Sequence, residues 1–228
     1  MATSQADAGG SQLTSGFLAG LTPSDRKVVL AAASLRRFVA NSVVTHQGTP
    51  ANRLFLLTKG RARYFFNTPD GRKVLLFWLV PGDTFGGAAL LSEPSEYHVS
   101  AETVKDSSVL VWDRSTVRAL AARYPRLLEN ELSTASDYLD WYVSTHLALT
   151  CHSARRRLAY VLSNLAHGLG QQNPRGTELN VTNEELAHAA NLAVFTVSRW
   201  LSEWQRQGAI VKRRGKVLVR SHERLFLY

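Results

Sequence analysis

The sequence predicts an α+β fold in three parts: an N-terminal β-roll (jelly roll), a single long helix, and a C-terminal helical domain with a β-hairpin. Three observations predict this fold. Short apolar runs separated by glycine and proline fill residues 38–112, apolar residues recur at steps of three and four over 125–150, and two helical patterns with a hairpin fill 182–219. We expect a disordered start over 1–16, the β-roll with flanking helices over 17–123, the long helix over 124–151, and the last domain over 152–228.

The β-roll is predicted from its turns. The clearest hairpin runs from Arg61 to Leu79 around Thr68-Pro69-Asp70-Gly71, because Asp-Gly tolerates the positive φ angles of a tight turn. Ahead of the strands, residues 22–37 have apolar residues at helical spacing, which predicts one or two short helices. Residues 1–16 are small and polar, without the basic start and apolar run of a signal peptide.

The long helix carries one apolar stripe. A helix that follows a β domain has little local surface to cover, so pairing with its copy in a second subunit would bury the stripe. The alternative is an ordinary core helix within one chain. We therefore expect a homodimer whose interface consists of Leu128, Leu132, Ala135, Leu139, Val143 and Leu147.

Charge and cysteine usage narrow the class of protein. Residues 151–228 hold 12 Lys and Arg against 5 Asp and Glu, whereas residues 1–150 hold 15 against 13, in a chain of net charge +9. A basic C-terminal third suits nucleic-acid binding, although a basic face on an ordinary soluble domain is as common. The single cysteine, Cys151, excludes an internal disulfide framework and an all-cysteine iron–sulfur or metal site within one chain. The single cysteine suits a reducing cytoplasm, and no apolar stretch is long enough to cross a membrane. We therefore expect a cytoplasmic protein without a membrane partner. We also expect no metal and no cofactor.

The C-terminal domain has the spacing of a helix-turn-helix. Thr182-Asn183-Glu184-Glu185 fits a capping box, Asn191 suits a sharp turn, and a second helix follows over 194–207. A short hairpin around Arg213-Arg214-Gly215-Lys216 adds a basic wing. The alternative is an unrelated helical hairpin, because the pattern is degenerate.

A winged helix-turn-helix predicts double-stranded DNA as the partner. The start of the second helix would enter the major groove, where Arg199 can donate two hydrogen bonds to guanine and Phe195 can pack against a thymine methyl group. The alternative for Phe195 is a place in the core. The predicted DNA-binding residues are Thr182, Val194, Phe195, Thr196, Ser198, Arg199, Lys212, Arg213, Arg214 and Lys216.

From about Leu18 to Tyr228 the chain resembles the Crp/Fnr family of transcription regulators. The order and spacing of the landmarks carry the resemblance, and no single landmark does. They are Gln47-Gly48, Leu54-Phe55-Leu56-Leu57 with Gly60, Asp70-Gly71-Arg72, Pro81-Gly82-Asp83, Phe85-Gly86, Tyr124-Pro125 before the long helix, and Thr196-Val197-Ser198-Arg199. The resemblance implies a cyclic-nucleotide-binding-type β-roll, dimerisation through the long helix, a palindromic operator, and RNA polymerase as the downstream partner.

The effector pocket implied by the resemblance is degenerate. The family has a Glu after the glycine that matches Gly86 and an Arg-Ser pair about ten residues later, where this chain has Gly87 and Tyr97-His98. A hydroxyl pair on the long helix is replaced by Tyr142-Val143. A cyclic phosphate would then lack its guanidinium and a ribose its carboxylate. The degenerate pocket consists of Gly86, Gly87, Ala88, Tyr97, His98, Tyr142 and Val143.

We therefore expect control by an unidentified small molecule other than cyclic AMP. The alternatives are haem held by His46, His98 or His146, a cyclic nucleotide after all, or no ligand. Phe195 stands where the best-known family members carry Glu, so their half-site sequence is not carried over. No nucleophile elbow, phosphate loop, zinc-spaced histidine pair or isolated acid pair is present in the sequence, so we do not expect an enzyme.

Overall fold

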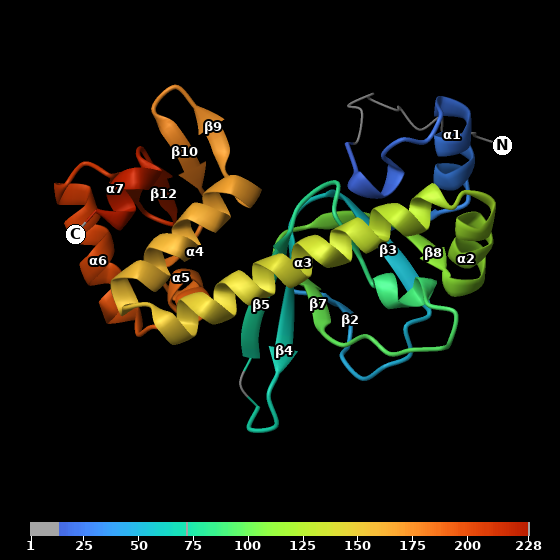
Figure 1. The fold of residues 1–228 in the computed structure, drawn as a ribbon, viewed down its shortest axis with the longest axis horizontal. Coiled ribbons are helices and arrows are strands. Elements are labelled where there is room, and N and C mark those ends of the chain that lie inside the picture. Colours follow the sequence, from blue (N-terminus) through green and yellow to red (C-terminus); the bar gives the residue numbers. More distant parts are fainter. Residues whose placement is uncertain (1–13, 72, 228) are drawn as a thin grey trace.

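A computed structural model describes residues 14–71 and 73–227. Figure 1 shows a β-roll and a helical domain at opposite ends of the long helix α3 (Arg126–Cys151). None of the described helices is both long enough and apolar enough to cross a membrane.

The β-roll consists of two antiparallel four-stranded sheets. The first has the order β1 (Ser34–Phe38), β8 (Ser107–Asp113), β3 (Arg53–Lys59) and β6 (Thr84–Phe85), and the second has the order β2 (Val43–Thr45), β7 (Ser100–Thr103), β4 (Ala62–Asn67) and β5 (Lys73–Leu79). Phe55 and Leu57 of β3 belong to the core shared with residues of both sheets, whereas Leu54 and Leu56 pack with residues of the flanking helices. Burial of both faces explains why β3 is a continuous apolar run.

Short helices flank the sheets. They are η1 (Gly16–Leu18), α1 (Pro23–Ala31), η2 (Gly87–Leu90) and α2 (Arg114–Arg123). Trp112 is fully buried beneath α1, and its indole N–H donates to the Val29 carbonyl oxygen at 2.9 Å. The hairpin predicted over 61–79 is confirmed, with Gly71 at φ 80° in the turn between β4 and β5.

The N-terminal segment differs from the expectation in two places. Helix α1 ends at Ala31 and β1 begins at Ser34, so the helix expected over 22–37 covers only the first half of that range. The second half pairs with β8 in the register Ser34↔Val111 to Phe38↔Ser107, and this long-range pairing overrides the local helical spacing. Of the start expected to be disordered, residues 1–13 lie outside the described residues, while Ser15 is buried and its hydroxyl donates to the Gly82 carbonyl at 2.8 Å.

Helix α3 leaves its apolar stripe uncovered within the chain. The stripe residues lie 47–71% exposed at Leu128, Leu132, Leu139, Val143 and Leu147, and Ala135 is exposed as well. Since an internal core helix would bury these side chains, the alternative of a core helix is wrong for this face of the single chain.

The C-terminal domain packs its helices against one face of a four-stranded sheet. It consists of α4 (Ala154–Leu169), β9 (Gln171–Asn173), β10 (Gly176–Leu179), α5 (Asn183–Ala190), α6 (Val194–Arg206), β11 (Ile210–Arg213), β12 (Lys216–Val219) and α7 (His222–Phe226). The sheet order is β11-β12-β10-β9, and its core includes Leu158, Leu186, Leu201 and Trp204. Strands β9 and β10 form a short hairpin over residues 171–179.

Candidate nucleic-acid interface and sensor site

The helix-turn-helix begins with a complete capping box. The Thr182 hydroxyl accepts from the Glu185 backbone N–H at 3.2 Å, and the Glu185 carboxylate accepts from the Thr182 N–H at 2.8 Å. Asn191 ends α5 in the left-handed region at φ 49°, which few residues other than glycine and asparagine adopt without strain. The short turn that follows fixes where α6 begins. Because the Thr182 hydroxyl serves the cap, this predicted DNA contact is already engaged within the protein.

Arg157 of α4 holds the turn in place. Its guanidinium donates to the carbonyl oxygens of Ala190 at 3.2 Å and Asn191 at 3.4 Å, at the end of α5. These carbonyls have no partner within their own helix, so the cation satisfies them and complements the helix dipole. No sequence pattern indicated this role, because it joins residues 33 and 34 positions apart.

Helix α6 presents one apolar face to the core and one polar face to solvent. Val197, Leu201 and Trp204 are fully buried. Phe195 is 75% exposed, so the alternative that placed it in the core is wrong. Arg199 is also exposed, with its guanidinium 4.8 Å from the centre of the Trp200 ring.

The exposed start of α6 forms what we call the reading face: Val194, Phe195, Ser198 and Arg199. Val194 is exposed, whereas Ser198 and the neighbouring Thr196 are half-buried. Among the described residues no carboxylate pairs with Arg199. Its donors are therefore available to a ligand that presents acceptors.

The wing is attached directly to the reading helix. The Lys212 N–H donates to the Gln205 side-chain oxygen at 2.9 Å, which links β11 to α6. Gly215 turns the hairpin at φ 68°, and Arg213 and Arg214 are exposed at its tip. Lys216 forms an ion pair with Glu178 of β10 at 2.6 Å, so part of its charge is neutralised within the sheet.

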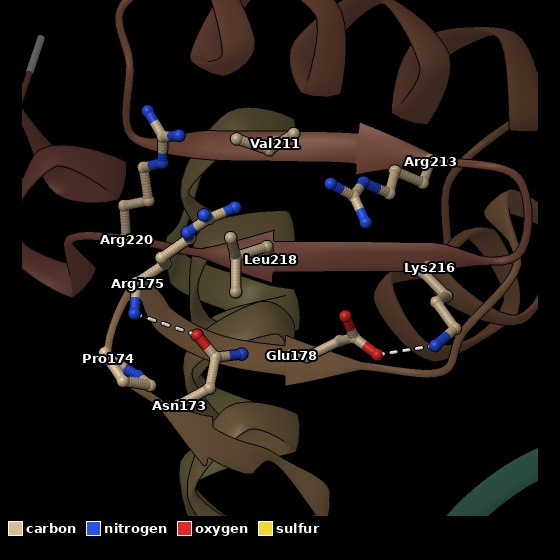
Figure 2. A pocket seen from close by; sticks show the side chains of 9 residues that line it. All are labelled: Asn173, Pro174, Arg175, Glu178, Val211, Arg213, Lys216, Leu218 and Arg220. Carbon is tan, nitrogen blue, oxygen red and sulfur yellow. Dashed lines mark hydrogen bonds and ion pairs between the residues drawn. The ribbon is translucent and has the colours of Figure 1, made fainter.

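The outer face of this sheet is hollowed and basic. Figure 2 shows Arg213 and Lys216 at the wing end of this face and Arg175 and Arg220 at the other end. These side chains surround a hollow of about 500 Å³, whose floor includes the apolar side chains of Val211 and Leu218. Within the described chain, Glu178 is the one acidic residue that lines the hollow. Arg175 and Arg220 were not predicted as site residues, because the strand pairing that places them on the same face as the wing was not predicted.

A second site lies where the β-roll meets α3. Gly86 adopts φ 81° at the start of η2, and a Cβ there would lie 2.7 Å from the Arg53 carbonyl oxygen. Tyr97 is buried beside it, with its hydroxyl donating to the Arg53 carbonyl at 2.9 Å and accepting from the Arg53 N–H at 3.1 Å. Burial raises the pKa of Tyr97. Tyr97 is thus a core residue with a satisfied hydroxyl, whereas His98 is exposed.

Glu131 of α3 is directed into this site. Its carboxylate accepts a hydrogen bond from the Thr84 hydroxyl, and a Cβ at Gly87 would lie 3.0 Å from its second oxygen. Burial raises the pKa of the Glu131 carboxyl to about 7, opposed by the Thr84 hydrogen bond. Tyr138, two turns further along α3, donates to the Thr84 carbonyl at 3.4 Å and packs edge-on against Tyr64.

The remaining predicted pocket residues lie elsewhere. Tyr142 and Val143 are exposed on α3, eleven and twelve residues beyond Glu131. Tyr142 lines a different cavity of about 1380 Å³, between β5, α3, α4 and α5. The structure therefore brings together Gly86, Gly87, Ala88 and Tyr97, and separates Tyr142 and Val143 from them.

Comparison with known proteins matches both halves of the chain. Residues 35–124 match the cyclic nucleotide-binding domain, and residues 156–226 match the Crp-like helix-turn-helix domain. The cyclic AMP receptor protein of Thermus thermophilus is 31% identical over 209 residues, covering 88% of this chain and 90% of the relative. The chain belongs to the Crp/Fnr family. It is therefore a DNA-binding transcription regulator of the Crp/Fnr type.

One further relative and two solved structures are similar to this chain. The CRP-like cAMP-activated global transcriptional regulator of Mycobacterium tuberculosis is 26% identical over 212 residues, covering 92% of this chain and 94% of the relative. The structure of FixK2 from Bradyrhizobium japonicum has a TM-score of 0.73 at 22% identity, covering 85% of this chain and 95% of that one, and supports the fold. The regulator CLP of Xanthomonas campestris, described as c-di-GMP responsive, has a TM-score of 0.73 at 20% identity, with 88% and 100% covered.

The family resemblance predicted side chains that the β-roll cassette lacks, but it gave no prediction for Glu131. Glu131 lies off the apolar stripe of α3 and is one of several acidic residues on that helix. Its inward direction emerges only from the docking of α3 onto the roll.

Proposed function

We propose that this Crp/Fnr regulator acts as a homodimer on a palindromic operator, with α6 of each subunit in adjacent major grooves. The observation that carries the proposal is the exposed reading face, led by Phe195 and Arg199, beside a basic wing tied to the same helix. A helix start with unpaired guanidinium donors suits the acceptors of guanine in the major groove, and Arg213 and Arg214 suit the flanking phosphates.

Dimerisation is supported by the uncovered stripe of α3. Five large apolar residues at helical spacing lie exposed along 20 residues of one helix face, from Leu128 to Leu147. An isologous pairing of two such helices buries both stripes at once. RNA polymerase is the proposed downstream partner, on the strength of the family resemblance.

A selection from random DNA tests the proposal. The bound pool is expected to contain a palindrome whose half-sites lie about 10 base pairs apart, centre to centre. Leu139→Glu places a charge in the stripe, and we expect monomers in sedimentation and loss of tight operator binding. Leu91→Glu is the matched control, because Leu91 is similarly exposed on the β-roll. A wild-type monomer that binds a single half-site tightly would contradict the dimeric arrangement.

We also propose that the controlling signal is not cyclic AMP. The similar proteins already differ in their effectors, since the regulator of Mycobacterium tuberculosis is cAMP-activated and CLP of Xanthomonas campestris is c-di-GMP responsive. In this chain Tyr97 is part of the core, and Glu131 adds a carboxyl where an anion would have to bind. Haem receives no support from His46, His98 or His146, which are all exposed.

Calorimetry with cyclic AMP tests this second part. We expect no saturable binding, because a buried phosphate without a cationic partner costs several kcal/mol, and each ~1.4 kcal/mol is tenfold in affinity. The same titration should be repeated with cyclic GMP. Micromolar binding that raises operator affinity would show that a cation from another strand completes the pocket.

A further inference from the structure

The Glu131 carboxyl occupies space that Gly87 leaves open. In the family a glutamate side chain follows the glycine that matches Gly86, and here that position has no side chain. The second oxygen of Glu131 lies where a Cβ of residue 87 would be only 3.0 Å away. The carboxyl of this site is therefore supplied by helix α3 and not by the β-roll.

No described cation neutralises this carboxyl. The groups that the structure places against Glu131 are the Thr84 hydroxyl of β6, the Tyr64 phenol of β4 and the Tyr138 phenol of its own helix. The Asp83 carboxyl, before β6, acts on the same two phenols. Burial raises the pKa of Tyr64, Asp83 and Tyr138 as well. An ionised Glu131 thus meets neutral or negative groups, with one hydroxyl as its donor.

The same contact connects α3 to the β-roll. Thr84 bonds Glu131 through its hydroxyl and Tyr138 through its carbonyl. Tyr138 also packs edge-on against Phe77 of β5, with ring centres 4.8 Å apart. Because α3 runs directly into the domain that carries the reading face, a change in this docking reaches α6 through the helix itself (Figure 1).

We propose that Glu131 is a proton-operated switch, in which protonation of its carboxyl takes the place of effector binding and sets how α3 docks on the β-roll. This inference rests on the proposed regulatory function. It names the proton as the signal at a site where the family binds a small molecule.

The pH window follows from the burial of the carboxyl. Burial raises the pKa of Glu131 from 4.5 to about 7, so the native state binds a proton that the unfolded chain has already lost between these values. Stability of the docked arrangement therefore falls as pH rises through this window and levels off above it. DNA binding coupled to docking must change across neutral pH.

Operator binding of the full-length protein, measured by fluorescence anisotropy from about pH 6 to about pH 8, tests the proposal. We expect wild-type affinity to change by about fivefold or more, the usual size of a coupling between two sites. Glu131→Gln, a neutral isostere of the protonated acid, should bind with the low-pH affinity of the wild type at every pH. The control is Glu129→Gln, on the same helix but exposed and paired with Arg126, which should keep the wild-type profile.

Gly87→Ala provides a second variant should Glu131→Gln fail to fold. Its methyl group would crowd the Glu131 carboxyl, displace it toward water and move the midpoint toward the ordinary pKa of a glutamate carboxyl. The proposal is overturned if Glu131→Gln or, in its place, Gly87→Ala keeps the wild-type pH profile, or if operator binding of the wild type is independent of pH. Loss of all sequence preference in the wild type would instead contradict the proposed function.

Discussion

In the winged-helix domain, the residues that begin and end α5 lie close together in the sequence, although Arg157 reaches the end of α5 from α4. Thr182 caps α5 with Glu185, three residues away, and Asn191 turns the chain into α6. In the β-roll, the contacts that position the sensor site join residues far apart in the sequence. Ser34 of β1 pairs with Val111 of β8 at a separation of 77 residues, and Thr84 contacts Glu131 at a separation of 47. The two domains therefore differ in how far apart in the sequence the residues of each functional site lie.

This difference indicates which functional residues can change without altering the fold. A locally capped helix pair keeps its form while its exposed residues change, so the reading face is free to vary among regulators. The sensor site is assembled from strand ends and a helix that meet only in the folded chain, so changing one member alters the docking of α3. Three predictions test or sharpen this contrast, in order of decreasing effect.

Removing one large core side chain from each domain tests their independence. Trp204 and Trp112 are both fully buried, and replacing either with alanine should cost about 3–5 kcal/mol. We expect calorimetry of Trp204→Ala to lower the unfolding transition of the winged-helix domain alone, and Trp112→Ala to lower that of the β-roll alone. If both transitions move together in each variant, the domains unfold as one unit and the contrast fails.

Arg199→Ala should remove base discrimination without unfolding the domain. A bidentate contact to guanine supplies about 1–3 kcal/mol per base pair, so competition gel shifts should show operator variants bound nearly alike. Arg214→Gln is the control. Loss of a phosphate contact lowers the affinity for all DNA sequences alike and reduces the salt slope by about 1. If Arg199→Ala ranks the operator variants in the same order as the wild type, residues other than the reading face recognise the bases.

The smallest effect compares two helix caps. Thr182 caps α5 and Thr22 caps α1 in the same way, each accepting from the backbone three residues on. Either Thr→Val change should cost about 1 kcal/mol of stability in its own domain, measured by denaturant unfolding. Of the two, Thr182→Val alone should weaken operator binding. Equal weakening by Thr22→Val would show that sensor stability limits DNA binding.

These local and distant contacts also explain how much could be predicted. The capping box, the αL asparagine and the glycine turns predicted the bounds of α5 and α6 to within a residue, because each is a short-range preference of the backbone. Residues 34–37 have helical spacing but form β1, because β8 supplies their hydrogen-bond partners. The exposure of Phe195 agrees with the interpretation that placed it in the major groove. The inward direction of Glu131 depends on packing, which a single sequence does not record.

The contact between Arg61 and Asn180 has a mechanical consequence. The Arg61 guanidinium donates to the Asn180 carbonyl at 2.7 Å and lies 3.8 Å from the centre of the Trp78 ring. Asn180 lies two residues before the Thr182 cap, so the β4–β5 hairpin touches the base of the helix-turn-helix. This hydrogen bond and the covalent path through α3 and α4 therefore connect the β-roll to the winged-helix domain at two separate points. Rotation of the winged-helix domain about the α3–α4 junction must therefore break this hydrogen bond or move the β4–β5 hairpin with it.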